Sequence, residues 1–266
     1  MNLGLFAATA RCLLLRDPAA KCLAVAELHA AVTAGAYYLD ADTPAPRVDQ
    51  PGRPELPVLT DPAKVPRRRL GTAVGRVALV HAVAHIEFNA INLALDAACR
   101  FRGMPEAYYR DWISVAADEV RHFKLLSHRL ADLGASYGDL PAHNGLWEMA
   151  ERTTDSCLVR MALVPRVLEA RGLDVTPGLI ERLQQVGDGA SIAVLEVILA
   201  EELRHVAIGS HWFNYCCELE GKIPLATFLD LLATRYGGTV RGPFNTKARL
   251  AAGFTASEMA ALEALK

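Results

Sequence analysis

The sequence predicts an all-α protein with a four-helix bundle at its centre. Strand-like alternation of polar and apolar residues is almost absent, whereas long segments carry apolar residues at helical spacing. A thirteen-residue block also occurs twice, starting at Ala117 and again 83 positions later at Ala200, with six identical positions. A duplicated helix pair supplies the four helices that such a bundle needs.

Glycines and prolines set the expected limits of the bundle helices. Glycines just past the periodic segments predict the helix ends, and the turn at 187–189 predicts the start of the last helix. We expect Pro165 to kink the third helix, and residues 173–187 to form a connection with a short helix after Pro177. The four helices are expected at about 70–101, 105–133, 146–171 and 189–220.

Three segments flank the bundle. Residues 3–34 predict two short helices, with Asp17 able to cap the second and Pro18 suited to its first position. Residues 40–69 hold seven of the fourteen prolines and predict an extended strap, whose apolar Leu56, Val58 and Leu59 place it over the bundle. The predicted division of one compact domain is an N-terminal helical extension at 1–39, the strap at 40–69, the bundle at 70–220 and a C-terminal loop with helices at 221–266.

Each repeated block carries a Glu-x-x-His motif. The three-residue spacing puts a carboxylate and an imidazole on one face of a helix. A further Glu precedes each motif, by 32 residues in the first copy and by 33 in the second. This is the ligand pattern of a ferritin-like bundle that holds two metal ions. The predicted ligands are Glu87, Glu119, His122, Glu169, Glu202 and His205.

The chemistry of these side chains favours two divalent ions. Carboxylates and neutral imidazoles suit iron and manganese and, less selectively, zinc; iron is the expected metal. Four carboxylates balance two divalent ions, so the site can be neutral inside an apolar bundle. Glu87 also supports a metal site, because its helix is otherwise apolar almost all round and the charged side chain needs a partner. The structural alternatives are an ion pair of Glu87 with Arg121 or Arg204, or surface Glu–His pairs.

Other polar residues weigh less. His128 and His211 lie six residues past the predicted ligand histidines, about 240° around the helix, and are expected off the site. His81 and His85 lie on the helix of Glu87; His85 is expected to be a hydrogen-bonded core histidine, and the role of His81 is left open. No redox tyrosine is evident near the site. If the Pro165 kink turns Glu169 away, the candidates to replace it are Glu148, Glu151 and Glu181.

Composition excludes several classes of protein. Hydrophobic residues make up 52% of the 266 residues and charged residues 22%, which supports a large core and excludes disorder. The net charge of −2 provides no field to attract nucleic acid. The six cysteines form no Cys-x-x-Cys pair, and neither a signal peptide nor a membrane span is expected. We therefore expect a cytoplasmic protein with reduced cysteines.

Longer motifs resemble one family. The chain is similar to the bacterial ferritin-like family catalogued as domain of unknown function 455 over most of its length. The resemblance implies a ferritin-like fold and a dimetal site, but no reaction. It rests on His-Ile-Glu87-Phe-Asn-Ala-Ile, Asp118-Glu119-Val-Arg-His122, Pro165-Arg-Val-Leu-Glu169-Ala-Arg-Gly-Leu-Asp174, Glu202-Leu-Arg-His205-Val-Ala-Ile-Gly and Arg241-Gly-Pro-Phe-Asn245.

Two functions from different classes fit these observations. The first is a dimetal O₂-activating oxidoreductase acting on an unknown organic substrate, with di-iron expected. The second is a metal-binding or iron-storage protein, or a scaffold that has lost its metal. The roughly 70 residues before the bundle and the loop at 241–245 suit a covered substrate pocket, which favours the enzyme. Arg241 and Asn245 are candidates for orienting a polar or anionic substrate, although loop anchoring is the ordinary role of each.

The partners follow from the same choice. O₂ and a small-molecule substrate are expected. Distant ferritin-like relatives include a tRNA-modifying hydroxylase, so tRNA stays among the options despite the charge. No membrane partner is expected. The oligomeric state is open, and a dimer is one option.

Overall fold

A computed structural model describes residues 2–45, 48–64 and 69–265. The predicted all-α class is confirmed, and a buried Glu and His cluster makes the fold compatible with the ferritin-like class. The strands within the described residues are β1 (Leu3–Gly4) and β2 (Tyr37–Tyr38), which pair in parallel. The chain divides into two compact units, residues 1–147 and 148–266, and each is described by itself.

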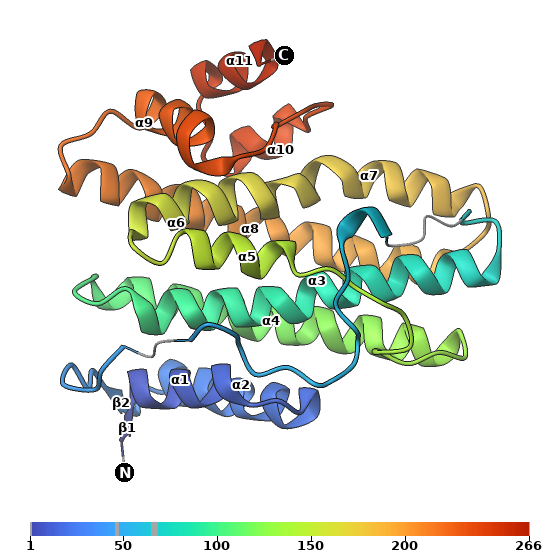
Figure 1. Ribbon diagram of the computed structural model, residues 1–266, viewed down its shortest axis with the longest axis horizontal. Helices are drawn as coiled ribbons and strands as arrows, with labels where there is room; N and C mark the ends of the chain where they lie inside the picture. The colour runs from blue at the N-terminus through green and yellow to red at the C-terminus, as the bar shows by residue number, and fades with distance from the viewer. Residues whose placement is uncertain (1, 46–47, 65–68, 266) are drawn as a thin grey trace. The chain divides into compact units, whose positions relative to one another are not determined.

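The first unit is built on an antiparallel pair of long helices, α3 and α4, which pack along one another (Figure 1). α1 packs on α3, and α2 packs on α4. Asp17 caps α2 as predicted, because its carboxylate accepts a hydrogen bond from the Ala20 N–H at 2.8 Å. The expected helices at 70–101 and 105–133 are confirmed within three residues. The elements are α1 (Leu5–Leu14), α2 (Pro18–Thr33), the 3₁₀ turn η1 (Pro62–Lys64), α3 (Ala73–Arg100) and α4 (Glu106–Asp132).

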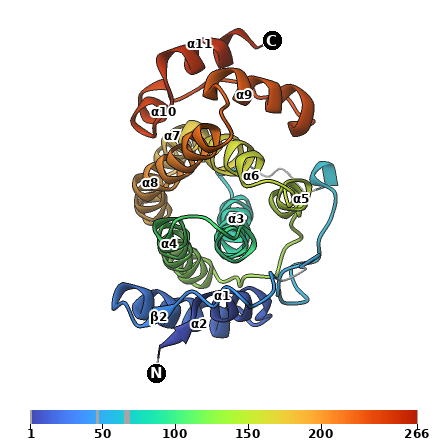
Figure 2. The same ribbon diagram turned by 90° about the vertical axis from the view of Figure 1, so that its left-hand side faces the viewer.

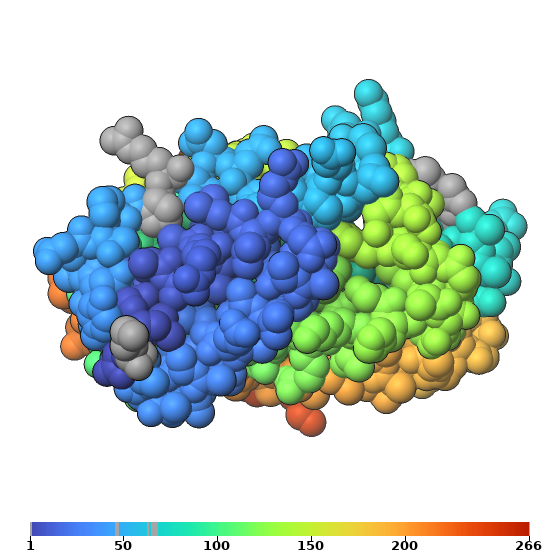
Figure 3. Space-filling model, turned by 90° about the horizontal axis from the view of Figure 1, so that it is seen from below, coloured from blue at the N-terminus to red at the C-terminus, as the bar shows by residue number. Residues whose placement is uncertain are grey.

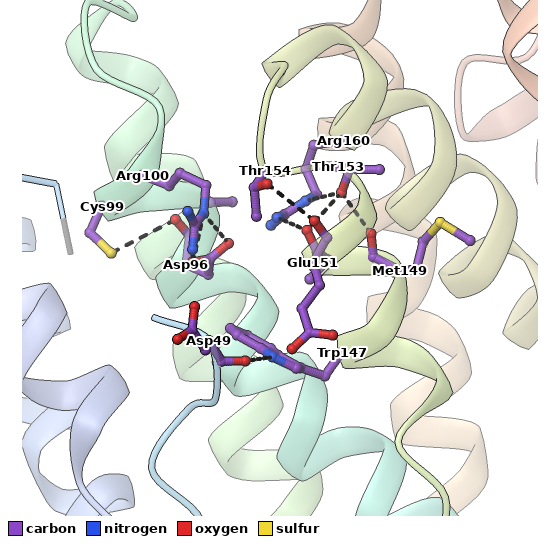
Figure 4. Close-up of polar contacts among 12 residues, drawn as sticks. Asp49, Asp96, Cys99, Arg100, Trp147, Met149, Glu151, Thr153, Thr154 and Arg160 are labelled. Carbon is purple, nitrogen blue, oxygen red and sulfur yellow. Dashed lines mark hydrogen bonds and ion pairs between the residues drawn. The ribbon is translucent and has the colours of Figure 1, made fainter. Parts of the chain in front are cut away.

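α3 is apolar enough and long enough to cross a membrane by length and composition alone, whereas no membrane span was expected from the sequence. In the most apolar 18-residue window of this helix, 67% of the residues are buried inside the protein. That burial is what the core helix of a soluble protein shows. Asp96 near its end pairs with Arg100 at 2.7 Å on the same helix (Figure 4).

Backbone hydrogen bonds fix the Pro-rich strap to the N-terminal helices. The Gly52 N–H donates to the Leu13 carbonyl at 2.8 Å, at the end of α1. The buried Lys21 ammonium of α2 donates to the carbonyls of Leu13 and Gly52, at 3.0 and 2.7 Å, and to the side chain of Asn92 on α3. One lysine therefore joins both N-terminal helices, the strap and α3. Figure 3 shows the N-terminal helices and the strap side by side on one face.

The side chains expected to hold the strap are not the ones that do so. Leu56 and Val58 are 56% and 60% exposed, so that part of the prediction is wrong. The backbone of this part pairs instead with the loop after α4: the Thr60 N–H donates to the Ala142 carbonyl at 2.8 Å, and the Ala142 N–H to the Val58 carbonyl at 3.1 Å. The Trp147 indole N–H also donates to the Asp49 carbonyl at 3.0 Å (Figure 4). The prolines at 46 and 66 lie outside the described residues.

The second unit contains another antiparallel pair, in which one arm is a single helix and the other is segmented (Figure 1). Figure 2 shows α6, α7 and α8 end-on, side by side. α8 is the continuous arm and confirms the helix expected at 189–220. The segmented arm is α6, η2 and α7, and the C-terminal helices pack on both arms. The elements are α6 (Cys157–Leu163), the π-helix η2 (Val164–Glu169), α7 (Ala170–Gln184), α8 (Gly189–Leu219), α9 (Pro224–Leu231), the π-turn η3 (Leu232–Tyr236), α10 (Thr246–Ala251) and α11 (Ala256–Ala264).

The helix expected at 146–171 is wrong as one element. α5 (Gly145–Arg152) ends, and α6 starts after Ser156, whose hydroxyl accepts from the Val159 N–H at 3.3 Å. The buried Arg160 stabilises the break by donating to the Thr153 hydroxyl and the Ala150 carbonyl, both at 2.6 Å (Figure 4). The Arg160 donor and the Ser156 acceptor thus replace helical hydrogen bonds lost between the two segments.

The connection expected at 173–187 is also wrong, because α7 continues through Gly172 and Pro177. A proline inside a helix has no N–H for the carbonyl four residues earlier, here Leu173. The Asn245 side-chain amide donates to that carbonyl at 3.2 Å. The loop at 241–245 therefore satisfies the group that Pro177 leaves open, and the helix can continue.

Candidate metal centre

Three of the predicted ligands meet between α3 and α4 in the first unit. His122 Nδ1 lies 3.0 Å from Glu87 Oε2 and 3.3 Å from Glu119 Oε2. Each of the three residues offers one ligand atom, and these atoms lie within 4.8 Å of one another. All three side chains are buried. The antiparallel packing brings Glu87 of α3 level with the Glu-x-x-His motif of α4, as the spacing predicted.

The charge at this cluster favours a cation. Burial lowers the pKa of His122, but hydrogen bonds and the charges of Glu119 and Glu87 outweigh it and raise the pKa to about 11. In metal-free protein the imidazolium supplies the positive charge that two buried carboxylates need. A divalent ion bound by both carboxylates and a neutral imidazole would replace that proton. The donor set of two carboxylates and one imidazole fits iron, manganese or zinc.

The neighbouring Arg121 forms an ion pair on its own helix. Arg121 is exposed and donates to Asp118 on its own helix at 2.9 Å. A buried carboxylate such as Glu87 needs a charged partner, and His122 provides it.

The second unit holds the other three predicted ligands on its two arms. Glu202 and His205 are buried on α8, with His205 Nδ1 3.6 Å from Glu202 Oε1. Glu169 is the last residue of η2 on the facing arm and is half-buried. The three residues proposed as its replacements, Glu148, Glu151 and Glu181, are all exposed, so Glu169 remains the candidate in this unit.

The remaining histidines behave as expected of core or surface residues. The buried His81 accepts the Gly138 N–H at Nε2, 3.0 Å away, and the buried His85 bonds to Tyr137 and to the His143 carbonyl. His128 and His211 are exposed.

One feature near the cluster was missed from the sequence. Tyr137, in the loop after α4, places its hydroxyl 2.9 Å from His85 Nδ1. Its ring packs on Phe88 and Phe123, with centroids 5.6 and 5.0 Å away. These phenylalanines directly follow Glu87 and His122, so Tyr137 lies one aromatic layer from the cluster. Helical spacing carried no signal for it, because it lies outside the helices.

The structure thus defines an all-α protein whose buried Glu and His group could hold a metal ion. The family model described as "Protein of unknown function (DUF455)" matches residues 14–260, and the chain belongs to this family. An uncharacterized protein of Haemophilus influenzae is 47% identical over 213 residues, which covers 77% of this chain and 74% of that protein. No solved structure matches the chain significantly.

Proposed function

We propose that the protein is a dimetal oxidoreductase that uses O₂ to oxidise an organic substrate. The observation that carries the proposal is the buried cluster of Glu87, Glu119 and His122. The same set, a Glu followed by Glu-x-x-His, recurs in the second helix pair as Glu169, Glu202 and His205. We assign one divalent ion to each set.

Charge supports two ions. Each set contributes two carboxylates and one imidazole, so two divalent ions and six side chains make a neutral site. A neutral site avoids the large cost of burying uncompensated carboxylates. Iron is the first choice, and manganese or zinc are the alternatives that the same donors accept.

The residues have separate tasks in this proposal. The bound metal ions would supply O₂ binding and redox chemistry. Glu87 and Glu119 fix the ions and offset their charge, and His122 must release its proton to become a ligand. The burial of Glu119 and His122, both 0% exposed, keeps bulk water from this side of the site.

A storage or buffering protein is the second candidate, and the covering segments bear on the choice. The strap and the end of α1 line a cavity of about 520 Å³, around Leu14, Arg16 and residues 50–55. The loop at 241–245 is anchored to α7 through Asn245 and through the Arg241 carbonyl, which accepts from Arg171 at 2.9 Å. Neither segment is required to hold metal, which favours an enzyme over a store. That these segments roof a cavity reaching the metals stays a prediction.

Iron counting separates the candidates. Protein is loaded with Fe(II) without oxygen and then exposed to O₂, while oxygen uptake and bound iron per chain are measured. The proposal predicts oxygen uptake that stops at two iron ions per chain. Uptake of many more ions per chain would make the protein a store, and no binding would leave the scaffold interpretation.

A further inference from the structure

We infer that the buried Arg166–Glu258 pair is a positioning device that holds the π-helical turn η2, and through it the metal ligand Glu169. The inference rests on the proposed metal site and extends it to residues that touch no metal. It assigns a role to the C-terminal helices, which the ligand pattern does not use. Every contact in the argument lies within residues 148–266.

The first step is how η2 meets α8. Pro165, the second residue of η2, packs against Gly209 so closely that a Cβ built at Gly209 would lie 2.3 Å from the Pro165 Cβ. No side chain larger than glycine fits there without movement. This close approach fixes the position of η2 along α8. It also explains the glycine of the Glu202-Leu-Arg-His205-Val-Ala-Ile-Gly motif.

The second step follows from the antiparallel arms. Four residues on from Pro165 is Glu169, and four residues back from Gly209 is His205. Both intervals span about 6 Å of helix, so Glu169 lies level with His205. Four α-helical residues turn about 400°, and four residues with i→i+5 bonding turn roughly 330°. Either way Glu169 shares, within about 40°, the face of η2 that Pro165 presents to α8.

The third step is the anchoring of η2 by the side chain of Arg166. Arg166, next to Pro165, is 1% exposed and donates to Glu258 of α11 at 2.6 Å. Its guanidinium carbon also lies 4.4–4.5 Å from three ring centroids, those of Phe213, Phe228 and Phe254. Such a buried charge has one favourable position, because any shift separates it from its carboxylate. The position of Arg166 therefore sets the position of the turn that ends at Glu169.

A second buried pair in the same unit provides a matched control. Arg249 of α10 donates to both carboxylate oxygens of Asp174 on α7, at 2.9 and 2.7 Å, and both side chains are almost fully buried. This pair also joins a C-terminal helix to the segmented arm. It is anchored in α7 rather than in η2. Loss of either pair should destabilise the unit, but only loss of Arg166–Glu258 should move Glu169.

The test is a Co(II) titration of metal-free full-length protein without oxygen, read by visible absorption and by metal content. Wild type should bind two ions per chain. Glu258→Gln should weaken one of the two ions at least tenfold and change the spectrum at saturation. Asp174→Asn should bind both ions as wild type does, although thermal unfolding should show both variants to be less stable. If Glu258→Gln does not fold, Glu258→Asp can be used, because it keeps the charge but moves the carboxylate away from Arg166. It should weaken the binding of the same ion by a smaller factor.

The outcomes distinguish the two proposals. Wild-type affinity and spectrum in the folded Glu258 variant, with two ions bound, would overturn the positioning role and leave the metal site intact. Equal weakening by Asp174→Asn would overturn it too, because the effect would then be general destabilisation. Absence of Co(II) binding in wild type would remove the proposed function itself, and the positioning role with it.

Discussion

The two helix pairs carry the same predicted metal ligands on differently built backbones. In the first pair, α3 and α4 are unbroken, and Glu87 reaches His122 directly at 3.0 Å. In the second pair, the arm that carries Glu169 changes from α-helix to π-helix and back, and Glu169 is half-buried. The partner helices are alike, since Glu119 and Glu202 are each the fourteenth residue of α4 (Glu106–Asp132) and α8 (Gly189–Leu219).

This difference shows which structural features the two copies share and which ones vary between them. The level of the Glu-x-x-His motif along its helix is the same in both copies. The facing Glu can be delivered by a regular helix or by a distorted one, provided that other contacts hold the distorted segment. In the first pair Glu87 contacts His122 directly. In the second pair we infer that Pro165 and Arg166 hold the segment that carries Glu169.

The largest expected effect tests whether both pairs bind metal. A ligand that binds only the folded state stabilises that state by about 4 kcal/mol when its free concentration is about a thousand times its Kd. Glu119→Ala and Glu202→Ala should each lose most of the rise in Tm that Fe(II) gives chelator-treated protein. His128→Ala should keep it, since that side chain is exposed. If only the Glu119 variant lost the Fe(II)-dependent rise in Tm, the two pairs would not be equivalent, and metal would bind to the first pair alone.

A smaller effect should appear without metal. Glu87→Gln removes one charged partner of the buried His122, which should cost about 1.5–3 kcal/mol of unfolding free energy. Glu169→Gln replaces a half-buried carboxylate and should cost less than about 1 kcal/mol. Urea unfolding in the presence of chelator measures both. Equal losses would mean that the metal-free pairs are held in the same way.

A slightly smaller effect than that of Glu87→Gln concerns the backbone of the second pair. Gly209→Ala should cost about 1–3 kcal/mol, because its Cβ would overlap Pro165. Gly172→Ala, also in a helix but with nothing within 4 Å, should instead stabilise by up to about 1 kcal/mol. Thermal unfolding of the two metal-free variants gives the comparison. A neutral Gly209→Ala would show that the arms are not fixed at this contact.

The sequence predicted the regular parts of the fold. Apolar periodicity and terminal glycines predicted the positions of α3, α4 and α8. The sequence spacing between Glu87 and the first Glu-x-x-His motif predicted that these side chains meet, because residues at matched distances from the turn lie level on antiparallel helices. The segmented arm could not be predicted in the same way. Pro177 signals a helix end in any single sequence, and the donor that rescues it, Asn245, is brought there only by the tertiary fold.

The site was predictable to the same extent. Helical geometry predicted that Glu87, Glu119 and His122 meet, and their candidate ligand atoms lie within 4.8 Å of one another. It also predicted that His128 and His211 lie off the site, and both are exposed. It gave no signal for Tyr137, because a loop residue has no periodicity. Loop anchoring was the expected ordinary role of Arg241 and Asn245, and the contacts of both residues anchor the loop to α7.

The most direct test of the central claim is a crystal structure of the Fe(II)-loaded protein, grown without oxygen, with iron located by anomalous scattering. We predict two iron ions per chain. One should be bound chiefly by Glu87, Glu119 and His122, and the other chiefly by Glu169, Glu202 and His205. A single ion held by the first set alone, or no iron at the cluster, would contradict the claim.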